Sequence, residues 1–374
     1  MKFVKRLILI GLIVLIPTFL VWLPYFARIK NFWNIPLPES GMATIVANYD
    51  GPLYLVVAKT FYNQNLIKDN FQFPLSTQYY AAHFPLFPAL IKVFSYVLGF
   101  PYAMLAVTIG STVLCLYFFN KLLREYLDEK EALFLTFAFS LFPARFLIVR
   151  SIGSPEPLFL AGIIASIFYF SKKKYLLSGI WGAVAAATKS PGIILFVAYF
   201  LYLALPKIKE LKNKLNTYPI LLIPAALILV FLVYKFTFND FFAYFRSGDN
   251  IHLFFPPFQI FNYSAPWVGT FWLEEIIFVY LIGALGVLQL IKQKDYLFAW
   301  FVGLFFATTI FVSHRDLIRY SLPIIPFLYV AFRETLIKKE FKIALVFLII
   351  PIYLFSLAFI SQNVMPIANW GPFL

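Results

Sequence analysis

Long uninterrupted apolar runs, joined by short polar connections, occupy most of the chain. A helix needs about 20 apolar residues to cross a bilayer, and a spanning backbone must satisfy its own hydrogen bonds. The pattern therefore predicts about eleven transmembrane helices within a single domain, residues 1–374. We expect them at residues 7–27, 102–120, 132–149, 156–170, 175–188, 190–206, 218–236, 273–291, 296–313, 318–333 and 341–361.

The composition agrees with this pattern. Of the 374 residues, 62% are hydrophobic and 13% are charged, whereas soluble domains carry about a quarter charged residues. The mean hydropathy is +0.83. The apolar runs are continuous, whereas the strands of a membrane barrel would alternate between apolar and polar positions. The sequence therefore predicts an all-α polytopic membrane protein.

The net charge of +14 reports topology rather than a nucleic-acid partner. Lys and Arg gather in alternate connections, as the positive-inside rule requires of cytoplasmic loops. No soluble domain is present to carry a basic patch for nucleic acid. We expect a cell-membrane protein with a cytoplasmic N-terminus, or an endoplasmic reticulum protein if the source is eukaryotic. The basic connections are Lys121/Arg124/Lys130, Lys172–Lys174, Lys207/Lys209/Lys212/Lys214, Lys292/Lys294 and Arg333/Lys338/Lys339/Lys342.

Two long segments, 28–101 and 237–272, then fall on the non-cytoplasmic face. In the first, apolar residues recur at helical spacing from Leu53 to Phe61, with polar residues opposite. This pattern predicts a helix lying in the membrane interface. A second interfacial helix is expected from His83 to Leu98, because counting it as a span would invert every later loop.

Asp50 is the most distinctive acid of the first outer segment, since it stands alone just before that helix. A carboxylate there could act as a base on a hydroxyl held at the bilayer surface. The alternative is that Asp50 only caps the helix, with Gly51 and Pro52 as ordinary helix-start residues. Both roles could hold together.

Glu156 lies between two prolines at the outer mouth of a predicted span. Ionisable residues at membrane depth are costly, so they suggest a functional site. The alternative is a helix-start glutamate that interacts with the helix dipole and pairs with Arg150.

Cations that could bind a phosphate lie in two further connections. Lys189 interrupts two apolar runs and could hold a lipid phosphate, although a lysine at a helix end also snorkels to the interface. Arg315 and Arg319 are four residues apart and are expected on one helix face, where they suit a phosphodiester. An ion pair of these arginines with Asp316 is the competing interpretation.

No metal or cofactor is expected. The single cysteine, Cys115, lies inside an apolar run, and the histidines His83, His252 and His314 lack the spacing of metal ligands.

Several of these stretches together resemble a known family. Tyr49–Tyr54 resembles the Trp-Asp-Gly-x-Trp-Tyr motif of PIG-V-type mannosyltransferases, with Tyr49 and Leu53 in place of the two tryptophans. The Arg-Tyr-x-Leu-Pro motif of the wider GT-C superfamily matches Arg319–Pro323. The other stretches similar to the family in the same order are His83–Pro88, Phe142–Ala144, Ser154–Phe159 and Thr188–Gly192.

The resemblance implies a GT-C-like bundle with interfacial helices in its first outer loop. Such enzymes transfer a hexose, here expected to be mannose, from a polyprenyl-phosphate donor to a glycan, lipid or protein acceptor, with inversion and no metal. By the resemblance, Asp50 is the base and Glu156 a second acid, while Lys189 and Arg319 hold the donor phosphate. The full set of expected substrate-binding residues is His83, Arg150, Lys189, Arg315, Arg319 and Tyr320.

The main alternative is a flippase or transporter of lipid-linked sugars. A transporter needs polar groups along a midplane path, whereas the apolar runs here are nearly uniform and the acids lie outside them. A ligase-like enzyme with a pyrophosphate-linked donor would place arginines in a late outer loop, but segment 237–272 has only Arg246. If Asp50 is not the base, Glu156 or Asp69 is the next candidate.

Overall fold

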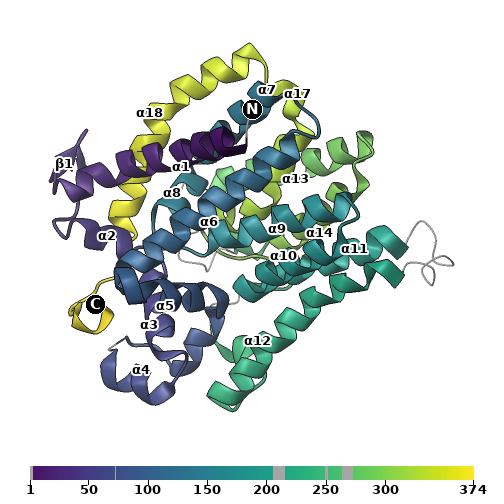
Figure 1. Cartoon of the computed structure of the whole chain (residues 1–374). Helices are drawn as coiled ribbons and strands as arrows, with labels where there is room; N and C mark the ends of the chain where they lie inside the picture. The colour runs from purple at the N-terminus through teal and green to yellow at the C-terminus, as the bar shows by residue number, and fades with distance from the viewer. Residues whose placement is uncertain (1–2, 72, 205–214, 249–251, 263–272) are drawn as a thin grey trace.

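The computed structural model describes residues 3–71, 73–204, 215–248, 252–262 and 273–374, and nearly all of its regular structure is helical (Figure 1). The predicted all-α fold is confirmed. The elements up to residue 98 are α1 (Phe3–Phe26), β1 (Asn31–Phe32), β2 (Ile35–Pro36), α2 (Met42–Val46), α3 (Gly51–Thr60), α4 (Gln64–Asn70), η1 (Thr77–Ala82) and α5 (Leu86–Leu98). β1 and β2 form a small antiparallel hairpin.

The centre and the C-terminal part of the chain are almost entirely helical. The central elements are α6 (Phe100–Leu123), α7 (Glu129–Leu141), α8 (Ala144–Ser151), α9 (Glu156–Ser171), α10 (Tyr175–Thr188), η2 (Ser190–Ile193), α11 (Ile194–Ala204), η4 (Leu215–Leu221), α12 (Leu222–Phe238), η5 (Ala243–Arg246) and η6 (Gln259–Phe261). The C-terminal elements are α13 (Leu273–Lys292), α14 (Tyr296–Thr309), α15 (Leu317–Ser321), η7 (Leu322–Ile324), α16 (Ile325–Ala331), α17 (Arg333–Leu336), α18 (Lys339–Gln362) and η8 (Gly371–Phe373).

A helix lies at each of the predicted apolar runs, but not all of these helices are long enough to cross a bilayer. Within the described residues, five helices have the length and composition of a span: Val4–Phe26, Phe100–Leu123, Asn216–Phe238, Leu273–Lys292 and Lys339–Gln362. The other apolar helices are shorter. The structure thus supports a multi-pass membrane protein, with fewer full-length spans than the sequence predicts.

The run 132–149, predicted as one straight span, is two helices. α7 and α8 meet at an angle of 74°. Pro143 lies at the break. A proline interrupts a helix because it has no N–H to continue the hydrogen bonds and clashes with the preceding turn. The bend brings the first residues of α8 towards the site described below.

The first helix predicted in the first outer segment, α3, packs inside the molecule. α3 is buried on nearly all sides, including Leu53 and Val57 on the expected apolar face and Tyr54 on another. α5, α6 and the last residues of the chain cover α3, so it has no free polar face, and its position in the interface plane stays a prediction. Lys59, expected on its polar face, donates from Nζ to the carbonyl oxygen of Pro372 at 2.6 Å.

The connections predicted to be cytoplasmic meet one another at one end of the molecule. Ion pairs link the N-terminal segment and four of these connections: Arg6 with Glu129 at 3.9 Å, Lys172 with Glu125, and Arg333 with Asp295 at 3.9 Å. This agrees with a common side for these loops, and the cytoplasm as that side stays a prediction. The lysines at 207, 209, 212 and 214 lie outside the described residues.

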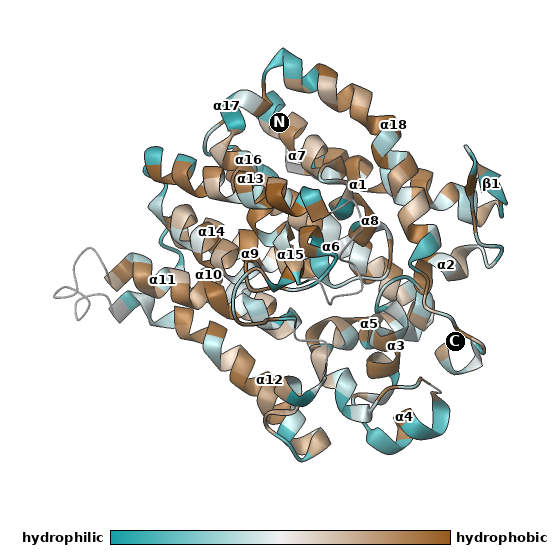
Figure 2. Ribbon diagram, turned by 180° about the vertical axis from the view of Figure 1, so that it is seen from behind, coloured by the Kyte–Doolittle hydropathy of each residue, from teal (hydrophilic) through white to brown (hydrophobic). Residues whose placement is uncertain are grey.

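Large apolar side chains face outward on the outer helices. Figure 2 shows hydrophobic residues along α12, α13 and α18, and hydrophilic ones at α4 and at the connection from α17 to α18. Phe236 of α12 is 85% exposed and Phe347 of α18 is 76% exposed. Such surface is unfavourable in water and suits lipid.

Candidate active site

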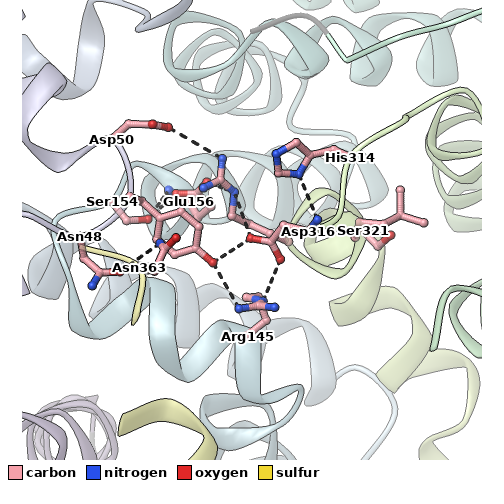
Figure 3. A network of polar contacts seen from close by, with 12 residues as sticks. Asn48, Asp50, Arg145, Ser154, Glu156, His314, Asp316, Ser321 and Asn363 are labelled. Carbon is pink, nitrogen blue, oxygen red and sulfur yellow. Dashed lines mark hydrogen bonds and ion pairs between the residues drawn. The ribbon is translucent and has the colours of Figure 1, made fainter. Parts of the chain in front are cut away.

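Acids and cations from distant parts of the chain meet in one cluster (Figure 3). They come from the turn before α3, the first residues of α8 and α9, the end of α10 and the start of α15. The cluster consists of Asp50, Arg145, Glu156, Lys189, Asp316 and Arg319.

Glu156 is the buried acid that two cations share. Its side chain is 7% exposed, and its Oε1 atom lies 2.7 Å from Lys189 Nζ and 3.4 Å from Arg319 Nε. The hydroxyl of Ser154 donates to its other oxygen. A carboxylate neutralised in this way is a poor proton acceptor, because taking up a proton would leave two buried cations without a partner. Glu156 therefore acts here as a counter-ion.

Asp50 differs from Glu156 in being open to solvent. It occupies the position before the first residue of α3, but its side chain makes no capping hydrogen bond. Its carboxylate is 41% exposed and lies 3.9 Å from Arg319 Nη2. Asp50 thus occupies the N-cap position of α3, as the capping alternative expects, but its side chain does not cap the helix. Its carboxylate oxygens are accessible to a substrate hydroxyl.

A close backbone contact within the first outer segment requires glycine directly after Asp50. A Cβ atom on Gly51 would lie 2.4 Å from the carbonyl oxygen of Val46, at the end of α2. The carbonyl oxygen of Gly153, in the turn before α9, lies at an ordinary contact distance of 3.5 Å from that position. Only glycine therefore fits where the chain turns from α2 into α3.

Arg319 is the central cation of the cluster. Besides Glu156 and Asp50, its Nε atom lies 4.0 Å from Asp316 Oδ2, and its guanidinium lies over the ring of Tyr49 at 4.5 Å. Arg315, expected on the same helix face, precedes α15 and is exposed. That part of the prediction is wrong, because the helix begins only at Leu317.

Arg145, which the sequence reasoning missed, is the second arginine of the cluster in place of Arg315. Its Nε atom lies 2.9 Å from Asp316 Oδ1, and its guanidinium lies over the ring of Phe359 at 3.8 Å. The Tyr49 hydroxyl donates to Asp316 Oδ2 at 2.7 Å. A signal was present, since Arg145 directly follows the Phe-Pro-Ala stretch.

His83 and Tyr320 lie at the margins of the cluster. His83 is buried at the end of η1, with its ring against that of Tyr54 at 4.8 Å, and its Nδ1 atom is without a partner among the described residues. Burial lowers the pKa of His83, while the nearby charge of Asp50 opposes this shift. Burial thus disfavours the charged form of His83. Tyr320 packs against the ring of His314 at 5.3 Å.

Arg150 lies elsewhere and does not pair with Glu156. It is fully buried and donates from Nε to Ser140 O at 2.9 Å and from Nη1 to Val14 O at 3.1 Å and Thr18 Oγ1 at 2.8 Å. These bonds join α8 to α1 and α7. The pairing expected from sequence proximity is wrong, and the contacts of Arg150 are structural.

The described residues contain no group of three or more His, Cys, Asp and Glu side chains that could hold a metal ion. Cys115 is buried in the core. Metal-free chemistry stays a prediction from the sequence.

The fold and the cluster define an α-helical, multi-pass membrane protein with an acid–cation site built from its first outer segment and its bundle. No family model and no curated protein matches the sequence. The chain is similar in structure to the Archaeoglobus fulgidus oligosaccharyltransferase, crystallised in complex with Zn and sulfate, with a TM-score of 0.51 and 15% identity. The match covers 96% of this chain and 54% of that one, so the chain spans about half the length of the solved structure. This likeness confirms the GT-C type of fold that the sequence predicted.

Proposed function

We propose that the chain is an integral-membrane glycosyltransferase of the GT-C type, with Asp50 as the base that activates an acceptor hydroxyl. One observation carries the proposal. Of the three acids in the cluster, Glu156 and Asp316 are buried in close ion pairs, whereas Asp50 is accessible and faces a cation across 3.9 Å. The fold shared with an oligosaccharyltransferase supports the class of reaction.

The chemistry follows from this arrangement. The acceptor hydroxyl loses its proton to Asp50 as its oxygen attacks the anomeric carbon of the sugar. The bond between that carbon and the phosphate oxygen breaks, and the phosphate leaves with the electron pair, which inverts the anomeric centre. General base catalysis of this kind contributes about 10²- to 10⁴-fold to the rate.

The charge balance of the cluster helps the leaving group. Three acids face the three cations Arg145, Lys189 and Arg319 before the proton moves. When Asp50 becomes protonated, Arg319 loses one anionic partner at the moment when the phosphate gains charge. Preorganised cations stabilise such developing charge, and Arg319 is only 13% exposed.

The finer assignment rests on the resemblance to PIG-V-type enzymes. It comprises a polyprenyl-phosphate donor, mannose as the hexose, and a glycan, lipid or protein acceptor at the non-cytoplasmic face. Lys189 and Arg319 would hold the donor phosphate, and His83 and Tyr320 are further candidates for substrate binding.

The test uses purified chain in detergent with polyprenyl-phosphate-[14C]mannose, the glucose donor in parallel, and an acceptor membrane extract. We expect transfer by the wild type and a loss of about 100-fold or more in Asp50→Asn. The matched control is Asp69→Asn, the same change at an exposed acid on α4, which should transfer normally.

Two outcomes would contradict the proposal. Equal transfer by wild type and Asp50→Asn would remove Asp50 as the base and direct attention to Asp69. No transfer by any folded variant with either donor would count against the enzyme itself. Liposome translocation of the same donors would then test the flippase alternative.

A further inference from the structure

The turn that carries Asp50 is fastened by the end of the last long helix. Asn48 and Val364 form an antiparallel bridge, and the Tyr49 N–H donates to Asn363 O at 3.3 Å. We call residues 360–365 the C-terminal clamp.

The side-chain amides of Asn48 and Asn363 complete this contact (Figure 3). Asn48 is fully buried and donates from Nδ2 to the carbonyl oxygen of Ile360 at 2.7 Å. Its Oδ1 atom accepts a hydrogen bond from Asn363 Nδ2 at 3.3 Å. Both polar ends of the buried amide are thereby satisfied, which makes the clamp specific in geometry rather than a general apolar contact.

Tyr49 joins the clamp to the ionic cluster. Its ring lies between the guanidinium of Arg319, at 4.5 Å, and the ring of Phe359, at 5.5 Å. Its hydroxyl donates to Asp316 at 2.7 Å and accepts from Arg145 Nη1 at 3.3 Å. Tyr49 therefore contacts α8, α15 and α18 at once.

The backbone of Tyr49 is in an unfavourable conformation. Its φ angle is +47°, in the left-handed region that costs an L-residue about 1–2 kcal/mol. Such conformations persist where the surrounding contacts over-determine them, and they are frequent at functional sites. The next residue is Asp50, whose own side chain is held by a longer ion pair.

We propose that Tyr49 is the positioning residue of this site. The C-terminal clamp holds Tyr49, and Tyr49 in turn keeps the Asp50 carboxylate facing Arg319. The inference rests on the proposed function for its catalytic meaning, because a base must be held within reach of the proton it accepts. The arrangement itself does not depend on that function and can be measured separately.

A thiol in place of Asp50 reports on this arrangement. Cys115 is fully buried, so Asp50→Cys, made with Cys115→Ala, provides a single accessible thiol. The rate of labelling by a soluble maleimide against pH gives the pKa of that thiol. Proximity of Arg319 should lower it to about 7.5, from about 8.5 for a free cysteine.

The Tyr49→Phe substitution removes only the hydroxyl that binds Asp316. We expect the pKa of the introduced thiol to rise towards 8.5, and Asn363→Ala, which acts through the clamp, to have the same effect. The control is Tyr353→Phe, since the Tyr353 hydroxyl of α18 binds Leu20 O away from the turn. It should leave the thiol pKa unchanged.

An unchanged thiol pKa in folded Tyr49→Phe and Asn363→Ala variants would overturn the positioning role, even if the wild type transfers sugar. Conversely, the expected shift without any transfer activity in the wild type would leave the positioning role standing and contradict the proposed function. If the wild type is active and Tyr49→Phe lowers kcat by about 10-fold or more with little change in KM, the result supports both the positioning role and the proposed function.

Discussion

Replacing Glu156 by Gln removes the charge that two cations share, and the cost can be worked from the geometry. Lys189 and Arg319 lie 2.7 Å and 3.4 Å from the same carboxylate oxygen. With about 4 Å between charge centres and an effective dielectric constant of about 20, one such attraction is about 4 kcal/mol. Desolvation offsets part of it, but removing one partner leaves the others buried and unpaired. We expect Glu156→Gln to lower the free energy of unfolding by about 3 kcal/mol.

A double-mutant cycle separates this interaction from other effects. Lys189 is 26% exposed, and Arg319 still neutralises Glu156 when the Lys189 charge is removed. Lys189→Gln should therefore lower the free energy of unfolding by only about 1.5 kcal/mol. The double variant should cost hardly more than Glu156→Gln alone, because its second substitution removes a cation that has already lost its partner. The expected coupling energy is about 1.5 kcal/mol.

The assay is unfolding in detergent micelles, followed by tryptophan fluorescence. The same cycle at the exposed pair of Glu125 and Lys172 is the matched control, and there we expect a coupling below about 1 kcal/mol. Additive effects of Glu156→Gln and Lys189→Gln, within about 0.5 kcal/mol, would refute the assignment of Glu156 as a shared counter-ion.

Three further predictions concern the surroundings of the cluster. Gly51→Ala should lower stability and transfer sharply, whereas Gly153→Ala should be milder. The reason is that a Cβ on Gly51 meets a backbone carbonyl at 2.4 Å, while one on Gly153 meets the flexible side chain of a methionine. The melting temperature and the transfer rate of both variants test this difference. Burial and the neighbouring His252 lower the pKa of His314 to about 3, so the unfolded state binds a proton that the folded state does not, and stability should fall as the pH drops below about 6.5. In His314→Asn, whose side-chain oxygen can still accept the N–H of Asp316, the slope of melting temperature between pH 6.5 and 5 should be shallower, and an unchanged slope would contradict this. Arg150→Lys should lower the melting temperature and leave the KM for the donor unchanged, whereas a raised KM with normal stability would return Arg150 to the site.

The sequence was most informative about the helices. Hydropathy locates each apolar helix, because burying an apolar run in lipid depends on that run alone. It overestimated the full-length spans where a run contained a break, as at Pro143, and it did not reveal that α3 is covered on nearly all sides. The burial of α3 depends on α5, α6 and the end of the chain, which no local period reveals.

The site was predictable in its members but not in its pairs. Asp50, Glu156, Lys189 and Arg319 stand out in the sequence as isolated charges beside apolar runs, and the structure brings these four together. The wrong expectations, such as Arg150 next to Glu156, took nearness in sequence for nearness in space.

The missed contacts are the long-range ones. Tyr49 and Asp316 are 267 positions apart, and a single sequence carries no signal that joins them. The pairing of Arg145 with Asp316 was missed for the same reason, although the Phe-Pro-Ala stretch before Arg145 marked its neighbourhood.

The clamp also fixes when the site can form. Asn48 leaves the ribosome 315 residues before its partner Asn363. At about 5–20 residues per second, this interval is about 15–60 s. Throughout it, the helices up to α14 can enter the membrane while the turn carrying Asp50 has no partner strand. We therefore expect a chain that stops before residue 360 to insert most of its bundle and still lack the contacts that hold the turn carrying Asp50.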